Sequence, residues 1–164
     1  SRSEESGKGI LSSHLHSEGK YAKELALEGP STSRWVPEII AENNPDDESY
    51  YPYMNGQFVF KNAVVRFSEA IIEGLEANGL QKEDINMLIP HQANLRIAQF
   101  IQRKFQLNDD QVYNNIMNYG NTTAASVIIA LTEAWEKGKI NDGDLVVLAA
   151  FGSGFTWGSV MVRW

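Results

Sequence analysis

The sequence predicts an α/β domain in which helices pack against a mixed β-sheet. Short apolar runs of strand length alternate with longer segments whose apolar residues recur at helical spacing. Helices between buried strands are typical of α/β layers, and the last two predicted strands follow each other as a hairpin. The chain has 164 residues, 43% hydrophobic and 21% charged, which suits one compact domain with a real core.

The first half of the chain is predicted to contain a strand, an irregular segment and a long helix. Residues Ile10–Ser17 favour a strand that ends in a turn at residues 18–20. Residues 21–57 hold four of the five prolines, so we expect a cap with little regular structure. Helical spacing of apolar residues predicts a helix from Phe58 to Asn78, and Gly79 is suited to end it.

The second half is predicted to alternate between buried strands and helices. Strands are expected at residues 85–89, 145–150 and 157–164, because each is a short apolar run. Helices are expected from His91 to about Phe105 and from Ala124 to Lys137. Thr122 or Thr123 is suited to cap the second of these helices, and Gly138 is suited to stop it.

Composition and charge exclude several classes of function. There is no cysteine, so the chain itself has no disulfide, no thiolate metal site and no thiol nucleophile. A net charge of −7 argues against a general nucleic-acid binder. No apolar run approaches the roughly 20 residues that a membrane helix needs. We interpret residues 1–8 as a polar tail or linker before a domain at 9–164, and we expect a cytoplasmic setting.

Unusual polar residues fall at the ends of predicted strands and the starts of helices, where α/β proteins gather ligands. His91 follows an apolar strand directly after Pro90, where it can exchange a proton or polarise a carbonyl, or simply fix the turn. Asn121 precedes a helix, where its amide can donate to a developing oxyanion, or simply form a turn. The glycines of residues 151–154 let the backbone approach a ligand, or simply make a tight hairpin.

Taken together, these segments resemble β-ketoacyl-acyl-carrier-protein synthase III. The matching strings are PHQANLRI at residues 90–97, YGNTTAAS at 119–126 and AFGSGFTWGS at 150–159. Further similarity lies in GILSSHLHSEG at 9–19, YPYMNGQFVFKNAV at 51–64 and GDLVVLAAF at 143–151. The resemblance runs in order over nearly the whole chain. It implies the C-terminal half of a thiolase-like fold.

The resemblance also implies a reaction and two catalytic residues. In this family a cysteine in the N-terminal half, which we expect to be missing here, takes an acyl group from acyl-CoA. Malonyl on an acyl carrier protein then loses CO₂, and the resulting carbanion attacks the acyl thioester. His91 and Asn121 match the two residues that stabilise the enolate-like oxygen. The isolated chain is therefore expected to be inactive.

Ten further residues match family positions around the site. Ser153 matches a position, usually Gly, whose backbone N–H completes an oxyanion hole; Phe151 and Gly152 line the same wall. Contacts to the pantetheine arm of coenzyme A or carrier protein are implied for Asn94, Gly56 and Phe60. Basic positions that receive the acidic carrier protein are implied for Lys61, Arg96, Arg103 and Lys104. Each also has a plain structural interpretation, as a turn, a core aromatic or a solvated helix face.

The implied partners are the N-terminal half, an acyl carrier protein and a second copy of the full-length enzyme. No cofactor is expected beyond the coenzyme A thioester and the phosphopantetheine of the carrier protein, and no metal. His14 and His16 share one face of a strand, but no third ligand is evident. A non-catalytic scaffold or carrier-docking module is the alternative, and acyl transfer to an oxygen or nitrogen nucleophile is a third.

Overall fold

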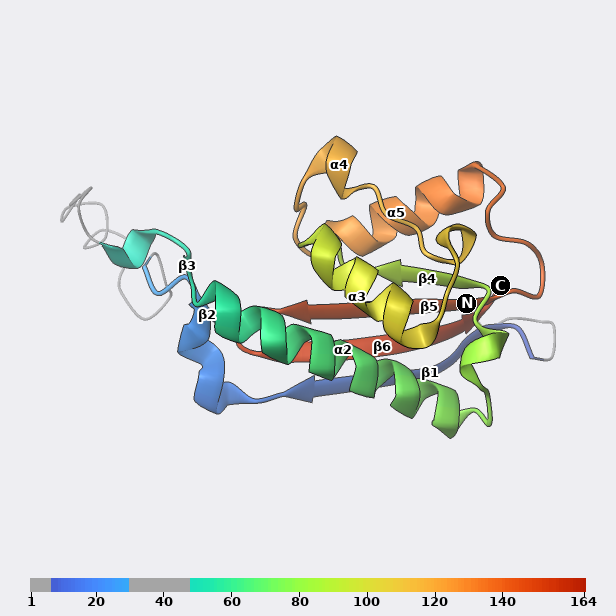
Figure 1. Cartoon of the computed structure of the whole chain (residues 1–164), viewed down its shortest axis with the longest axis horizontal. Coiled ribbons are helices and arrows are strands. Elements are labelled where there is room, and N and C mark those ends of the chain that lie inside the picture. The colour runs from blue at the N-terminus through green and yellow to red at the C-terminus, as the bar shows by residue number, and fades with distance from the viewer. Residues whose placement is uncertain (1–6, 30–47) are drawn as a thin grey trace.

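The fold is a four-stranded mixed sheet with helices on both faces (Figure 1). The computed structural model describes residues 7–29 and 48–164. The sheet order is β1-β6-β5-β4, in which β6 is antiparallel to both neighbours and β4 is parallel to β5. The strands are β1 (Gly9–Ser17), β4 (Met87–Pro90), β5 (Leu145–Gly152) and β6 (Thr156–Arg163). The predicted mixed α/β sheet is confirmed.

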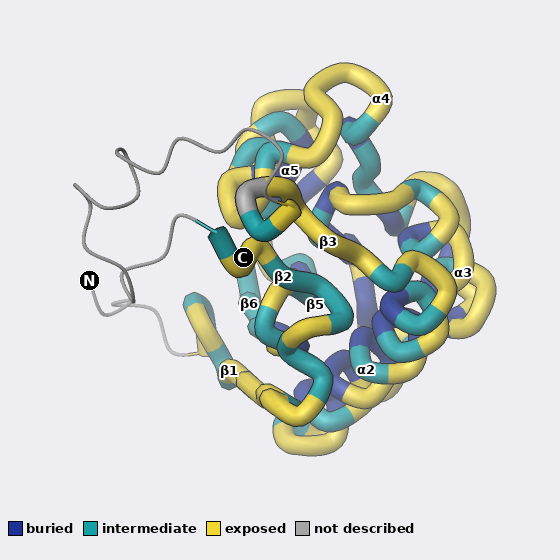
Figure 2. The backbone as a smooth tube through the Cα atoms, turned by 90° about the vertical axis from the view of Figure 1, so that its left-hand side faces the viewer, coloured by how far each residue is buried: buried dark blue, intermediate teal, exposed yellow. Residues whose placement is uncertain are grey.

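Two apolar cores lie on opposite faces of this sheet. Helix α2 (Gly56–Ala77) and helix α3 (Leu95–Phe105) cover one face, and helix α5 (Ala125–Glu136) covers part of the other. Strand β4 serves both cores, because successive side chains point to opposite faces. Leu88 joins the core under α2 and α3, whereas Met87 and Ile89 join the core under α5. The buried residues of α2 lie on the side of the helix that faces the sheet (Figure 2).

Local capping explains where the long helix α2 begins and ends. The Asn55 side chain accepts a hydrogen bond from the Phe58 backbone N–H, which satisfies one of the free donors of the first turn. At the other end, Gly79 has φ +65°. Its N–H and that of Leu80 bond back to the Glu76 and Leu75 carbonyls, which is a Schellman motif. The predicted stop at Gly79 is confirmed, while the helix starts two residues before the predicted Phe58.

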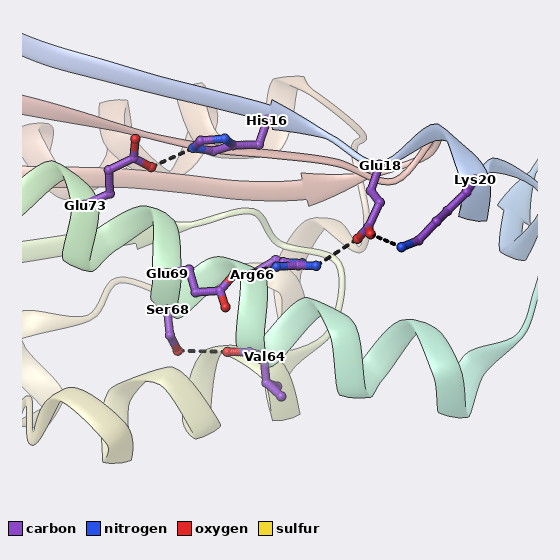
Figure 3. A network of polar contacts seen from close by, with 8 residues as sticks. All are labelled: His16, Glu18, Lys20, Val64, Arg66, Ser68, Glu69 and Glu73. Carbon is purple, nitrogen blue, oxygen red and sulfur yellow. Dashed lines mark hydrogen bonds and ion pairs between the residues drawn. The ribbon is translucent and has the colours of Figure 1, made fainter.

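A line of charged groups joins α2 to the edge strand β1 and the loop after it (Figure 3). His14 and His16, on the α2 side of β1, both contact the Glu73 carboxylate, at 3.2 and 2.6 Å. Two turns before Glu73 on α2, Arg66 forms 2.8 Å ion pairs with Glu18 and Glu69. The expectation that the two histidines share a face is confirmed, and their common partner is a carboxylate of α2.

The remaining described elements are short. They are the 3₁₀ helices η1 (Gly19–Glu24), η2 (Glu48–Tyr50), η3 (Lys82–Asp84) and η4 (Asp109–Gln111), the helix α4 (Ile116–Tyr119), and a two-stranded sheet of β2 (Leu25–Ala26) and β3 (Tyr53–Met54). The prediction of little regular structure in 21–57 therefore missed a small sheet. Residues 30–47 of that segment lie outside the described residues. In the described ranges, no helix is long and apolar enough to cross a membrane.

Several predicted boundaries were wrong. Helix α3 begins at Leu95 instead of His91, because residues 91–94 form a turn and Asn94 caps the helix by accepting from the Arg96 N–H. Neither Thr122 nor Thr123 caps α5, whose N-cap residue is Ala124 without a side-chain bond. Strand β5 continues through Gly152, so the hairpin loop is Ser153–Phe155.

Candidate active site

The loops singled out in the sequence meet at one end of the sheet. The His91 backbone N–H donates to the Ala149 carbonyl at 2.8 Å, which places His91 beside strand β5 as it leaves β4. A cavity of about 1330 Å³ opens there. Its walls contain nine of the twelve predicted site residues: His91, Asn121, Phe151, Gly152, Ser153, Asn94, Gly56, Phe60 and Arg96. The structure therefore confirms that the three loops lie around one cavity.

His91 is partly buried and held by one side chain. Its Nδ1 lies 2.6 Å from the Ser126 hydroxyl, which comes from the first turn of α5. Burial lowers the pKa of His91 below its usual value, because the imidazolium loses solvation. The ring is therefore neutral at physiological pH, and in that state one ring nitrogen is a donor and the other an acceptor.

Asn121 is fixed through its carbonyl oxygen. Its Oδ1 accepts a hydrogen bond from the Thr123 N–H at 2.9 Å, so it is Asn121 that organises the turn before α5. This turn places Thr123 at φ +53°, in the left-handed region, and Gly120 at φ +69°. Because the oxygen is occupied by the backbone, the amide NH₂ is the end of the side chain left for a ligand in the cavity.

Gln92 joins the His91 turn to the segment that leads to Asn121. Its side chain is buried, and its Oε1 accepts from the Asn115 and Ile116 N–H groups at 2.9 and 3.1 Å. Its Nε2 donates to the Pro90 carbonyl at 2.7 Å. The sequence did not single out Gln92, because the two backbone groups that donate to it lie 23 and 24 positions away and no local pattern marks them.

The β5–β6 hairpin forms the wall next to these two residues. Phe151 is buried and packs edge-on against Phe155, with ring centroids 5.0 Å apart. Ser153 is exposed and its hydroxyl donates to the Leu25 carbonyl at 2.9 Å, which ties the hairpin to β2. Neither Ser153 nor Gly152 has a positive φ, so serine is accommodated without backbone strain.

The basic residues lie mostly outside the cavity. Arg96 lines its rim, whereas Lys61, Arg103 and Lys104 do not contribute to its walls. All four are exposed, and none forms a salt bridge with another residue of the described ranges. Many other described cations are paired, such as Lys20 with Glu18 and Lys139 with Asp110. An acidic partner could therefore bind these four groups without breaking an existing ion pair.

The cavity offers hydrogen-bond donors, and a chain without cysteine brings no thiol nucleophile to it. A neutral imidazole and a primary amide are donors suited to an oxygen that gains negative charge during a reaction. The cavity walls are otherwise largely apolar, with Val59, Ala63, Phe67 and Ile97 among them. Donors in such surroundings act more strongly than in water. The site can stabilise an enolate or oxyanion, and covalent catalysis by cysteine requires a residue from another chain segment.

Known proteins of one family are similar to this chain in both sequence and structure. Residues 75–164 match the family described as 3-oxoacyl-[acyl-carrier-protein (ACP)] synthase III C terminal. The chain is 44% identical over 158 residues to a β-ketoacyl-[acyl-carrier-protein] synthase III of Rhodospirillum centenum, covering 96% of this chain and 45% of that protein. It is 45% identical over 160 residues to the same enzyme of Caldanaerobacter subterraneus, covering 98% of this chain and 47% of that protein.

Solved structures agree with the sequence comparison. The synthase III of Aquifex aeolicus superposes with a TM-score of 0.84 at 36% identity, covering 99% of this chain and 46% of that one. That of Pseudomonas aeruginosa superposes with a TM-score of 0.86 at 34% identity, covering 99% and 48%. The chain thus spans under half the length of these relatives. It belongs to the family of 3-oxoacyl-[acyl-carrier-protein] synthase III C-terminal domains, and its α/β fold is the thiolase-like fold of these structures.

Proposed function

We propose that this chain is the C-terminal catalytic half of a β-ketoacyl-acyl-carrier-protein synthase III. The observation that carries the proposal is the arrangement of His91 and Asn121, which reach one cavity from separate loops. Each is held by the protein through one polar atom, His91 by Ser126 and Asn121 by the Thr123 backbone. Each therefore has a second polar group available to a substrate oxygen.

The proposed reaction divides its groups between two halves of an enzyme. A cysteine thiolate on an N-terminal half first takes an acyl group from acyl-CoA and releases coenzyme A. Malonyl-carrier protein then loses CO₂, and the electron pair of the broken C–C bond delocalises onto the thioester oxygen. His91 and Asn121 donate hydrogen bonds to that oxygen. The enolate carbon attacks the acyl thioester, expels the thiolate and leaves a β-ketoacyl-carrier protein.

The same proposal gives a role to each of the other predicted site residues. The pantetheine arm would pass along Asn94, Gly56 and Phe60, which all line the cavity. The acidic carrier protein would bind Lys61, Arg96, Arg103 and Lys104, which form no salt bridge with another described residue. The backbone N–H of Ser153 would complete an oxyanion hole with the N–H of the cysteine, and Phe151 would shield the site from water. No cofactor is needed besides these thioesters.

An N-terminal half would also cover apolar surface that is exposed in this chain. On the α5 side of the sheet, Leu15 of β1 is 79% exposed, Ile128 of α5 is 59% exposed and Trp135 is 55% exposed. Exposed apolar side chains of this size are typical of an interface. We propose that the Cys-bearing half packs there, and that the complete cytoplasmic enzyme forms a homodimer.

The test is condensation by this chain assembled with a Cys-bearing N-terminal half, followed by mass spectrometry of the carrier-bound product. We expect the assembly to form β-ketoacyl-carrier protein and the chain alone to form none, because it has no thiolate. His91→Ala and Asn121→Ala should each lower the rate by about a hundred- to a thousandfold.

A non-catalytic scaffold gives a different result. Such a protein would bind the carrier protein with ordinary affinity, yet its assembly would form no product and would be indifferent to substitution of His91 or Asn121. Acyl loading of the isolated chain would overturn the assignment of the nucleophile to another half.

A further inference from the structure

The Ser126 hydroxyl has two hydrogen-bond partners in the turn after β4, His91 and Gln92. Its oxygen is 2.6 Å from His91 Nδ1 and 3.1 Å from the Gln92 backbone nitrogen. The side chain is buried, with 1% of its surface exposed, so water has almost no access to it. Both contacts reach 34 or 35 positions back along the chain, from α5 to the turn after β4.

The chemistry of these three groups fixes the direction of each hydrogen bond. The Gln92 backbone N–H can only donate, so the Ser126 oxygen accepts from it. The hydroxyl has a single proton, and within the described residues its one available acceptor is His91 Nδ1. A buried hydroxyl proton with no acceptor is costly, so this proton is directed to Nδ1. Nδ1 is then the acceptor nitrogen of the ring.

We propose that Ser126 is a positioning residue that holds neutral His91 as the Nε2–H tautomer, with its donor directed away from α5 and into the cavity. The lowered pKa of His91 agrees with this arrangement, because a neutral ring is the form that has an acceptor nitrogen. The role in catalysis rests on the proposed function, since the Nε2–H is the group that would donate to the enolate oxygen. The tautomer itself does not depend on that function.

The backbone link through Gln92 gives the arrangement a second purpose. The Gln92 N–H satisfies one lone pair of the Ser126 oxygen, and the Gln92 side chain holds the Asn115–Ile116 segment. The pair Ser126 and Gln92 thus orients the His91 ring and holds the segment that leads through α4 to Asn121. Ser126 touches neither substrate nor reacting atoms, so it acts only through His91.

The test is the histidine tautomer, read from long-range ¹H–¹⁵N correlation spectra. The 164-residue chain is labelled with ¹⁵N at its three histidines, alone or in complex with an unlabelled N-terminal half, and His91 is assigned with His91→Gln. We expect wild-type His91 to carry its proton on Nε2. In Ser126→Ala this preference should be lost, with Nδ1–H forming a substantial population, and Ser126→Thr should retain it.

Ser68→Ala is the matched control, because Ser68 is also buried in a helix but its hydroxyl donates to the Val64 carbonyl and not to His91 (Figure 3). It should leave the tautomer unchanged. If Ser126→Ala does not fold, Ser126→Cys replaces the hydroxyl by a weaker donor and should shift the tautomer in the same direction. An Nδ1–H tautomer in the wild type, or an unchanged Nε2–H tautomer in folded Ser126→Ala, would overturn the inference.

A kinetic readout separates this inference from the proposed function. In the assembled enzyme, Ser126→Ala should lower kcat for decarboxylation roughly two- to tenfold, the equivalent of one hydrogen bond, with KM unchanged. If His91→Ala retains full activity while the tautomer behaves as expected, the function fails and the positioning role stands. If His91→Ala is inactive while wild-type His91 is Nδ1–H, the function stands and the positioning role fails.

Discussion

At the scale of single residues, burial determines what His91 can do. A solvated histidine is partly protonated near neutral pH, whereas a neutral ring has one donor nitrogen and one acceptor nitrogen. The cavity lowers the pKa of His91 by removing water from the ring. The same burial has a measurable consequence for stability.

We expect the free energy of unfolding to fall as the pH decreases below about 6.5, the value for an unfolded histidine. In that range the unfolded chain binds a proton at residue 91 and the folded chain does not, so unfolding is favoured. Each unit by which the pKa is lowered is worth about 1.4 kcal/mol. Denaturant unfolding of wild type and His91→Gln at pH 5 to 8 measures this, and identical pH profiles would contradict it.

Gly158 shows a second residue-scale constraint, in packing. A Cβ at this position would lie 2.5 Å from the His14 backbone oxygen and 2.7 Å from a Leu15 methyl carbon, because β1 approaches β6 closely here. Gly158→Ala should therefore destabilise the chain by about 1–3 kcal/mol. Gly152→Ala is the matched control in the same hairpin, since its Cβ would meet nothing closer than 4.0 Å. Equal unfolding midpoints for the two variants would refute this packing.

The sequence identified the residues with special chemistry better than the residues that hold them. His91 and Asn121 could be picked out because each sits at the end of a recognisable strand or before a helix. Ser126 and Gln92 could not, because the hydrogen bonds that join Ser126 to His91 and Gln92 to Asn115 span 35 and 23 positions and depend on how β4, α4 and α5 pack. The predicted cap at Thr122 or Thr123 was also wrong: the turn held by Asn121 places Thr123 at φ +53°, outside the extended conformation of a typical N-cap residue.

At the scale of elements, α3 carries both a pocket contact and a charged surface. Asn94 caps the helix, and Arg96, Arg103 and Lys104 extend from it without acidic partners among the described residues. The helix period was readable from the sequence. Its start was not, since the turn of residues 91–94 is set by His91 and Gln92 contacts beyond the helix.

Charge reversal on α3 tests the proposed docking surface. Arg103→Glu should weaken binding of acyl carrier protein roughly fivefold or more at low salt, and the difference should shrink as salt screens the charges. Lys139→Glu is the control, because it makes the same charge change at a residue already paired with Asp110. Fluorescence anisotropy with labelled carrier protein gives both dissociation constants. Equal effects of the two variants would rule out a specific site on α3.

At the scale of the whole molecule, helices cover one face of the sheet more completely than the other. Helices α2 and α3 pack over one face of the sheet. On the opposite side, Leu15 of β1 and Ile128 of α5 itself stay exposed. Sequence patterning predicted the α/β layers, because alternation and helical spacing reflect burial. It did not predict which apolar residues stay exposed, because exposed and buried apolar residues follow the same spacing along the chain.

This exposed face should be where the other half binds. Ile128→Glu should prevent assembly with a Cys-bearing N-terminal half while the chain keeps its secondary structure, because a buried unpaired carboxylate is costly. Val65→Glu, at an exposed apolar position on α2, is the control and should assemble normally. Analytical ultracentrifugation with circular dichroism distinguishes them. Normal assembly by Ile128→Glu would place the interface elsewhere.

The decisive experiment on the proposed function is release of ¹⁴CO₂ from labelled malonyl-carrier protein by the assembled halves. It isolates decarboxylation, the step to which this chain would contribute both donors. We predict that wild type releases CO₂ and that His91→Ala and Asn121→Ala each reduce the rate about a hundredfold or more, with carrier-protein binding unchanged. Undiminished release by either variant would show that the cavity described here is not the decarboxylation site.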